Sequence, residues 1–361
     1  MEFSEEEYLA ALSTFEVLTS AKIASMLKQY SLPSKVFSAL ESGVESLAKH
    51  LSSKDVESIK KNINTAYVKN YIANLEKGGI KFLSIYGKLS DTLKNLFEMC
   101  SLVWLYYKGD LSLLEKDSIC IVGTRMPDAY GKKVTEDFTA ALSKAGLVIV
   151  SGLAAGIDSI AHNTCLKNGG KTIAVLGGGF GRVYPAFNAS LADKIAEDGL
   201  LLSEYAPSIS PNSYHFPVRN RIIAAISKAA LITQMGEKSG AMHTKNYAVE
   251  YGKNLYIVGA DCYREASAGN LRIIEEMPEA VVVSPSRILC EFGLFLAEQN
   301  KPVRQLSMDE QAVVNCLKEG EKHFDDLAAQ TNLPAGTLLS LLTSLKIDGI
   351  ITQLPANYYT L

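Results

Sequence analysis

The sequence lacks the residue clusters that build metal centres and disulfide frameworks. Its six cysteines are scattered between residues 100 and 316 without a C-x-x-C pair, and its five histidines stand at no paired ligand spacing. Closely spaced Cys and His are the usual mark of a zinc site or a disulfide-stapled fold. We therefore expect no metal and no disulfide framework. Scattered cysteines are instead typical of buried thiols in a reducing compartment.

Long apolar runs and a strong net charge are also missing. No run approaches the roughly 20 residues of a membrane span, and the acidic start over residues 1–7 has no signal-peptide character. We expect a cytoplasmic protein without a membrane span. The chain has 361 residues, a length that suggests two or three domains. It is 47% hydrophobic and 21% charged, so it can bury a sizeable interior. A net charge of −3 gives no general basic field for nucleic acid.

The arginines are unevenly distributed along the chain. The first 117 residues contain 14 lysines and no arginine, whereas all eight arginines lie after residue 124. Arginine is the side chain best suited to bidentate phosphate binding. An anion site is therefore expected in the middle of the chain.

Three regions differ in pattern. Residues 1–75 show apolar side chains at helical spacing, including a segment over Val44–Leu51, and predict a small helical module that is SAM-like or helix-hairpin-helix-like. Residues 76–300, with apolar strands from Ile119 onward separated by amphipathic helices, predict an α/β fold: a Rossmann-like, doubly wound, mostly parallel sheet. A linker from Lys301 leads to residues 305–361, where three helices and a hairpin predict a winged helix.

Gly- and Ser-rich segments occur in the sheet region, most of them directly after a strand. Such residues let backbone N–H groups approach an anion, and the following helix presents its N-terminus. The small residues concerned are Gly123, Ser151, Gly152, Gly177, Gly179, Ser239 and Gly240. The cations in these segments are Arg125, Lys171, Arg182, Arg219 and Arg221. Together they predict a phosphate-binding surface at the carboxyl ends of the strands.

The motifs of nucleotide enzymes are incomplete. Gly177-Gly178-Gly179 is followed by Arg182 where a dinucleotide fingerprint needs its third glycine, and no G-x-x-x-x-G-K-[ST] occurs. Asp158 and His162 lie four residues apart, which we interpret as a helix cap and a packed ring rather than an acid/base pair. The sequence therefore predicts no catalytic residues and no cofactor.

The order G-T-R…Y-G, S-G-L-A-x-G-I-D…A-H, K-T-I-A-V-L-G-x-G…Y-P-x-x-N, S-E…F-P-x-R-N-R-I-I and S-G-A-x-x-T resembles the DprA/Smf family, the DNA-processing proteins of bacterial transformation. The resemblance covers about residues 118–275. It implies a Rossmann-like domain that binds single-stranded DNA, forms a homodimer and helps to load a RecA-type recombinase. The family is not known chiefly for enzymatic activity.

By the same resemblance, Arg125 and Lys171 look like the main basic contacts to the DNA backbone. The segment that contains Phe216, Arg219, Asn220 and Arg221 looks like the support of the same pocket, with Phe216 as a stacking ring or a buried staple. The sequence departs from the family pattern at Gly181, at Gln234-Met235 and at Val258–Ala260, where a proline is missing.

Two alternatives stay open at this point. A nucleotide-binding enzyme of related fold, such as a phosphoribohydrolase, would need a P-G-G-x-G-T loop, and the Gly177–Arg182 segment lacks its Pro and Thr.

The second open question is whether the winged helix contacts DNA or protein. Its candidate recognition helix over Ala335–Asp348 has one Lys and no Arg, and residues 305–361 carry a charge of −4. We therefore expect this tail to contact protein rather than DNA.

Overall fold

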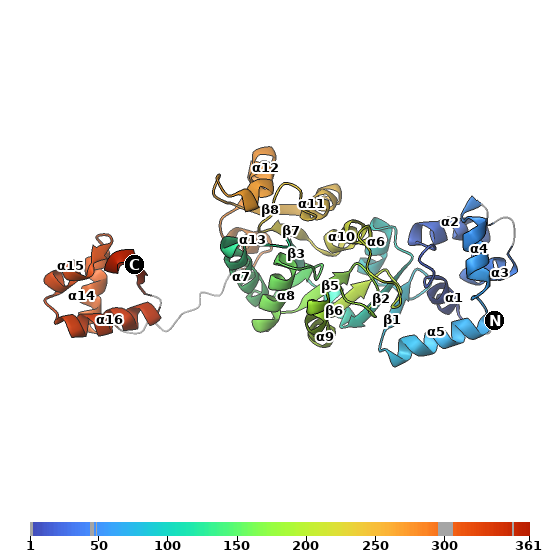
Figure 1. Ribbon diagram of the computed structural model, residues 1–361, viewed down its shortest axis with the longest axis horizontal. Coiled ribbons are helices and arrows are strands. Elements are labelled where there is room, and N and C mark those ends of the chain that lie inside the picture. Colours follow the sequence, from blue (N-terminus) through green and yellow to red (C-terminus); the bar gives the residue numbers. More distant parts are fainter. Residues whose placement is uncertain (1–2, 44–46, 48, 295–305, 349) are drawn as a thin grey trace. The chain divides into compact units, whose positions relative to one another are not determined.

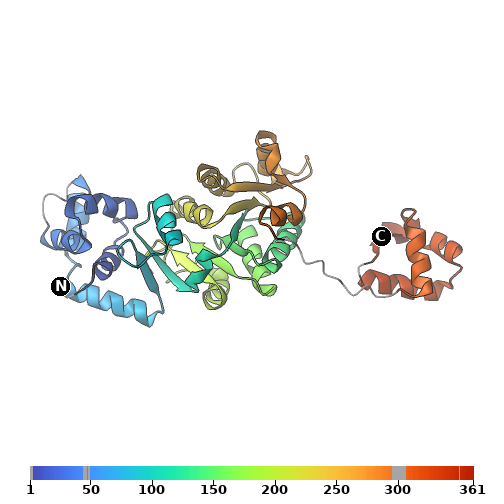
Figure 2. The same ribbon diagram turned by 180° about the vertical axis from the view of Figure 1, so that it is seen from behind.

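The computed structural model describes residues 3–43, 47, 49–294, 306–348 and 350–361. The chain forms two compact units, residues 1–297 and 298–361 (Figures 1 and 2). Within the described residues, none of the helices combines the length and the apolar character that crossing a membrane would require.

Helices begin the first unit, and the sequence pattern explains their ends. They are α1 (Glu5–Leu12), α2 (Ser20–Tyr30), α3 (Pro33–Ser42), α4 (Ser53–Lys60) and α5 (Thr65–Lys77). Ser4 and Glu7 form a capping box at the start of α1, and Pro33 occupies the first turn of α3. The helical region is confirmed. The helix predicted over Val44–Leu51 includes residues 44–46 and 48, which lie outside the described residues.

A nine-stranded sheet follows. Its strands are β1 (Lys81–Ser84), β2 (Trp104–Gly109), β3 (Ser118–Val122), β4 (Val148–Ser151), β5 (Thr172–Leu176), β6 (Leu200–Ser203), β7 (Ala229–Ile232), β8 (Asn254–Val258) and β9 (Val281–Val282). They are ordered β1-β2-β6-β5-β4-β3-β7-β8-β9. All neighbouring pairs from β6 to β9 are parallel, while β1–β2 and β2–β6 are antiparallel. The Rossmann-like prediction is confirmed, and β1 and β2 are additions that it did not include.

Helices cover both faces of this sheet, with α10, α11 and α12 above it and α7, α8 and α9 below it in Figure 1. These helices and their neighbours are α6 (Asp91–Met99), α7 (Ala129–Lys144), α8 (Ile157–Lys167), α9 (Ala189–Asp198), α10 (His215–Ile226), α11 (Ala241–Glu250), α12 (Ala268–Glu276) and α13 (Pro285–Glu291). Within β3, Cys120 belongs to one hydrophobic core and Ile121 to the other. A strand buried on both faces needs apolar residues throughout, which explains the missing alternation.

The N-terminal helices share a core with the edge of the sheet. Trp104 and Tyr106 of β2 are buried together with Leu9 of α1 and Val68 of α5. The Tyr106 hydroxyl also contacts the hydroxyl of Tyr71 at 2.7 Å. Residues 1–75 are therefore continuous with the sheet through their packing, and the structure keeps them in one unit with it.

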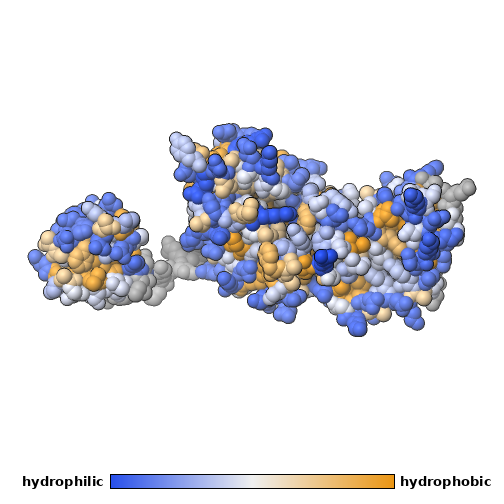
Figure 3. Space-filling model, viewed as in Figure 1, coloured by the Kyte–Doolittle hydropathy of each residue, from blue (hydrophilic) through white to orange (hydrophobic). Residues whose placement is uncertain are grey.

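The C-terminal unit has the winged-helix order. It comprises α14 (Met308–Leu317), β10 (Lys322–His323), α15 (Phe324–Thr331), α16 (Ala335–Ile347), β11 (Thr352–Leu354) and β12 (Tyr358–Thr360), with strand order β10-β12-β11. Leu338 and Leu342 of α16 are buried in its core, while Leu339 is 54% exposed. Figure 3 shows apolar surface where α16 runs. The linker predicted from Lys301 lies outside the described residues.

Candidate functional site

A cavity of about 870 Å³ opens at the carboxyl ends of the parallel strands, where β3 neighbours β7. The chain leaves β3 toward β4 on one side, whereas β7 leads to β8 on the other, so the direction of the strand order reverses here. Open α/β sheets bind their ligands at this topological switch point. We call the cavity the switch-point pocket. It is lined by Val122, Gly123, Thr124, Arg125, Ala154, Asp158, Tyr184, Pro211, Ser213, Phe216, Pro217, Arg219, Asn220, Gly236, Lys238, Ser239, Gly240, Ala241, His243 and Thr244.

Two buried charges form the inner wall of the pocket. Asp158, in the first turn of α8, accepts hydrogen bonds from the N–H groups of Gly152 at 3.1 Å and Ala154 at 3.3 Å. Arg219, on α10, donates through Nη1 to the carbonyl of Gly152 at 2.8 Å and to that of Val175. A side chain at Gly152 would lie 2.8 Å from Oδ2 of Asp158 and against the guanidinium of Arg219. A glycine is therefore required at position 152, because the side chains of Asp158 and Arg219 approach its backbone closely.

Burial and mutual attraction set the protonation of this pair. Burial lowers the pKa of Arg219 to about 10, against the opposing attraction of Asp158, so the guanidinium remains charged at neutral pH. Burial raises the pKa of the Asp158 carboxyl, and Arg219 is the main influence that lowers it. The inner wall therefore carries opposite charges held by backbone hydrogen bonds, and the cations at the rim decide which ligand the pocket prefers.

Arg125 stands at that rim. Its side chain is exposed, and the guanidinium carbon lies 5.5 Å from the centroid of the Phe216 ring. The Phe216 ring in turn lies 5.6 Å from Tyr184, which is 53% exposed. A Cβ at Gly177 would lie 2.6 Å from the Phe216 ring, so this glycine makes room for it. The guanidinium of Arg125 forms no hydrogen bond or ion pair with another described residue and remains available to a ligand.

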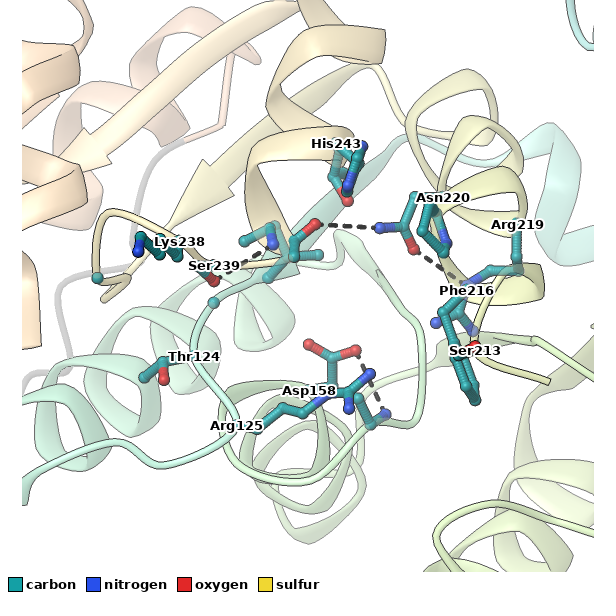
Figure 4. Close-up of a pocket in the computed structure, with 18 of the residues that line it drawn as sticks. Thr124, Arg125, Asp158, Ser213, Phe216, Arg219, Asn220, Lys238, Ser239 and His243 are labelled. Atoms are coloured by element: carbon teal, nitrogen blue, oxygen red, sulfur yellow. Dashed lines mark hydrogen bonds between the residues drawn. The ribbon is translucent and has the colours of Figure 1, made fainter. Parts of the chain in front are cut away.

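The opposite side of the opening comes from the loop between β7 and α11. Figure 4 shows Lys238 and Ser239 facing Phe216 and Ser213 across the pocket. Asn220 joins the two sides, because its amide nitrogen donates to the carbonyl of Gly240 at 3.4 Å. Two additional polar side chains complete this side, the exposed His243 and the buried Thr244, whose hydroxyl has no partner among the described residues. The opening is thus polar and carries cations at Arg125 and Lys238.

The structure brings together Gly123, Arg125, Phe216, Arg219, Asn220, Ser239 and Gly240 of the predicted site. Gly152 and Gly177 support it from behind, as described above. The Ser151 hydroxyl is buried and donates to the carbonyl of Ile121 at 2.7 Å. Gly179 lies in a loop, and its N–H donates to the carbonyl of Ile209 at 2.8 Å. Neither residue lines the pocket.

Three of the predicted cations, Lys171, Arg182 and Arg221, do not line the pocket, and here the expectation is corrected. Lys171 precedes β5 rather than following it, so about 16 Å of strand separates it from the carboxyl edge. Its Nζ donates to the carbonyl of Asp198 at 2.7 Å. Arg221 is two residues beyond Arg219, about 200° further around the helix. Its Nη2 contacts both carboxylate oxygens of Glu204 at 2.8 Å, away from the pocket.

The sequence interpretation missed several lining residues. Lys238 stands immediately before the Ser239-Gly240 segment and could have been included on that ground, as could Tyr184. The packed-ring interpretation of His162 is confirmed, whereas the helix-cap interpretation of Asp158 is wrong, because Gly156 is the N-cap of α8 and no side chain caps that helix. Asp158 accepts backbone N–H bonds, and His162 is a packed ring whose Nδ1 lies 2.7 Å from the Thr172 hydroxyl. Burial lowers the pKa of His162 to about 3, so the ring is neutral.

Gln234 shows how one departure from the family pattern is used. The side chain is buried at the end of β7, where Oε1 accepts from the N–H of Asp128 at 3.1 Å and Nε2 donates to Ser267 at 3.2 Å. Its carbonyl accepts from the N–H of Thr124 at 2.8 Å. Gln234 therefore holds the loop that carries Arg125 against β7.

Comparison with known proteins assigns the chain to a family. The family model described as DNA recombination-mediator protein A matches residues 87–293, and the model of the DprA winged helix domain matches residues 297–357. The chain belongs to the DprA/Smf family of DNA-processing proteins. It is 38% identical over 227 residues to the DNA processing protein DprA of Bacillus subtilis (strain 168), which covers 62% of this chain and 76% of that protein. It is 33% identical over 294 residues to the protein Smf of Synechocystis, which covers 71% of this chain and 74% of that protein.

Two solved structures of DprA proteins share the fold. The DprA structure from Streptococcus pneumoniae superposes with a TM-score of 0.60 at 32% identity and covers 81% of this chain and 99% of its own. The Helicobacter pylori protein has a TM-score of 0.52 at 28% identity and covers 59% of this chain and 95% of its own. The latter structure is described as showing a single-stranded DNA binding mode.

Proposed function

We propose that this chain binds single-stranded DNA in the switch-point pocket and, as a homodimer, mediates loading of a RecA-type recombinase onto that strand. The main support for the DNA site is the exposed guanidinium of Arg125. It forms no ion pair with a described residue and lies over the Phe216 ring. A cation beside an aromatic ring is suited to a nucleotide, because the phosphate meets the charge while the base meets the ring.

The shape of the site favours a single strand over a duplex. The pocket is concave, and its aromatic groups, Phe216 and Tyr184, lie at the opening beside Arg125. Bases in a duplex are stacked on one another and cannot reach such rings, whereas an unpaired base can. The chain carries a net charge of −3. Affinity should therefore depend on a small number of phosphate contacts and on stacking.

The relatives support this proposal. The H. pylori protein, which has the same fold, is described by its binding of single-stranded DNA. The description of the family as DNA recombination-mediator protein A supports the recombinase partner, and the homodimer is the expectation that the family resemblance implies. Both are tested separately below.

The alternative of a nucleotide-binding enzyme would place a phosphate on the loop after β5. The N–H of Gly179 already donates to the carbonyl of Ile209 at 2.8 Å, and that of Gly181 to the carbonyl of Pro207 at 2.9 Å. A Cβ at Gly178 would lie 2.8 Å from Pro211. Because the chain itself occupies the N–H groups of Gly179 and Gly181, the loop has fewer donors to offer a phosphate, and DNA binding is the better supported function.

Fluorescence-polarisation titrations with labelled oligothymidylate test the DNA site. Arg125→Ala should weaken binding about tenfold, because a charge-assisted phosphate contact contributes about 1.5 kcal/mol or more. It should also reduce the slope of log affinity against log salt by about 0.7. Arg272→Ala is the matched control, since Arg272 is exposed on α12 and pairs with Glu276 at 3.2 Å. Equal affinities for both variants at several salt concentrations would place the site elsewhere.

The finer proposal requires a recombinase assay. The chain should accelerate assembly of a RecA-type filament on single-stranded DNA covered by a single-strand binding protein, and Arg125→Ala should lose this effect together with DNA affinity. Sedimentation velocity checks the homodimer. DNA binding without any change in filament assembly would limit the function to strand binding.

A further inference from the structure

A second cavity lies on the other side of α10, between the N-terminal helices and the sheet. Its volume is about 340 Å³. The residues that line it come from three distant stretches of the chain: 13–21, 100–104 and 204–221. It shares no lining residue with the switch-point pocket, although both adjoin α10. We call it the helix-side cavity.

The walls of the helix-side cavity are mainly aromatic and aliphatic. Phe15, Trp104 and Tyr205 contribute rings, while Leu18 and Ile209 contribute aliphatic side chains. Trp104 is 2% exposed and Leu18 is 1% exposed, so the cavity reaches the buried core. Apolar, aromatic walls with few polar groups, at the lower end of the usual pocket volumes, are typical of sites for small organic ligands.

The charged groups at this cavity already satisfy each other. Both carboxylate oxygens of Glu204 lie 2.8 Å from Nη2 of Arg221, and the Ser20 hydroxyl donates to the same carboxylate at 2.6 Å. Nε of Arg221 donates to the carbonyl of Cys100 at 3.1 Å. The interior therefore has no uncompensated charge to offer. A charged ligand would lose its hydration without gaining a counter-ion, which is a large cost.

The mouth of the cavity adds a second restriction. Glu16, whose side chain is about half exposed, accepts a hydrogen bond from the Tyr214 hydroxyl at 2.7 Å and lies 3.4 Å from Nε2 of His215. Its carboxylate disfavours an anion at the entrance. The exposed Ala21 also lines the cavity.

The Tyr205 hydroxyl is the group of the cavity that we consider as a donor to a ligand. The Tyr205 hydroxyl forms no hydrogen bond with a described residue, although the ring is half-buried and stacked on His215 with centroids 4.0 Å apart. Burial raises the pKa of Tyr205, so the hydroxyl stays protonated and can donate. Tyr205 lines the cavity, so a ligand with a hydroxyl or amide oxygen would accept its hydrogen bond.

We propose that the helix-side cavity binds a small neutral aromatic molecule of one or two rings that carries a hydroxyl or amide group. The rings pack against Phe15, Trp104 and Leu18, and the polar group pairs with Tyr205. This site is separate from the proposed DNA site and does not depend on it.

The chain contains a built-in reporter, because Trp104 is its single tryptophan. Bromine quenches tryptophan emission on contact, so 4-bromobenzyl alcohol serves as a neutral aromatic probe, with excitation at the red edge of the tryptophan band. Titration of the full chain should give saturable quenching of Trp104. The anion 4-bromobenzoate, with the same ring and bromine, should give only weak, linear collisional quenching.

Two variants of α2 locate the binding. Ala21→Leu places a larger side chain in the mouth without altering the core and should raise the dissociation constant of the probe about tenfold. Ser25→Leu is the matched control, since Ser25 is exposed on the same helix and does not line the cavity. Linear quenching by the neutral probe, equal quenching by its anion, or equal dissociation constants for the two variants would overturn the proposal. Trp104 lines the helix-side cavity and does not line the switch-point pocket. The result is therefore independent of oligothymidylate binding.

Discussion

Replacing Arg219 by methionine keeps most of the length of this buried side chain and removes the guanidinium beside Asp158. The carbonyls of Gly152 and Val175 lose their charged donor, and the Asp158 carboxylate loses the cation that stabilises it. Arg219 is 4% exposed and Asp158 7% exposed, so water can replace the lost interactions only in part. Removing one partner of a buried charged pair costs about 3–5 kcal/mol, and we expect that loss in the free energy of unfolding at pH 7.

The sign of the pH dependence follows from Asp158. Burial already raises its pKa in the folded state, and removal of Arg219 raises it further. A carboxyl whose folded pKa exceeds its unfolded pKa stabilises the fold below the unfolded pKa, and this stabilisation is lost as pH rises through the folded pKa. The deficit of Arg219→Met relative to the wild type should therefore shrink as the pH falls from 7 toward the ordinary carboxyl range.

A double variant separates charge from packing. Asp158→Asn in the Arg219→Met background removes the uncompensated carboxylate and should recover part of the lost stability at pH 7. Urea unfolding followed by the emission of Trp104 measures these values in the first unit, which contains both residues. A loss below about 1 kcal/mol for Arg219→Met, or a double variant no more stable than the single one, would refute the importance of the buried pair.

Three further predictions concern the DNA site and use the same oligothymidylate titration. Phe216→Ala should weaken binding by about 1–3 kcal/mol through lost stacking, whereas Phe216→Tyr should retain it. Lys171→Ala should leave the affinity and its salt slope as in the wild type, because Lys171 lies at the opposite edge of the sheet from Arg125; a loss equal to that of Arg125→Ala would contradict this geometry. Deleting residues 298–361 should change the affinity by no more than about threefold, or roughly 0.6 kcal/mol, and a larger loss would show that the acidic tail contributes to DNA binding.

The local pattern of the sequence was enough to predict the general architecture. Apolar strands from β3 onward, separated by amphipathic helices, are typical of a doubly wound sheet because strands covered on both faces cannot contain regular polar positions. The position of Gly123 and Arg125 directly after a strand was enough to place them at the ligand-binding edge, because all parallel strands end there. These conclusions depend on periodicity and on the order of neighbouring residues, which a sequence displays directly.

The tertiary structure decided which side chains share a pocket. Arg219 and Arg221 are two residues apart on α10, and only the packing of that helix determines that Arg219 faces the switch-point pocket while Arg221 pairs with Glu204. The antiparallel strands β1 and β2 were missed because they are separated by α6 and not by a short turn. The helix-side cavity joins segments about 80 to 200 residues apart in the chain, as the distance from residue 15 to residue 205 illustrates. Contacts across such separations arise from packing between elements, for which the local pattern of a sequence contains no record.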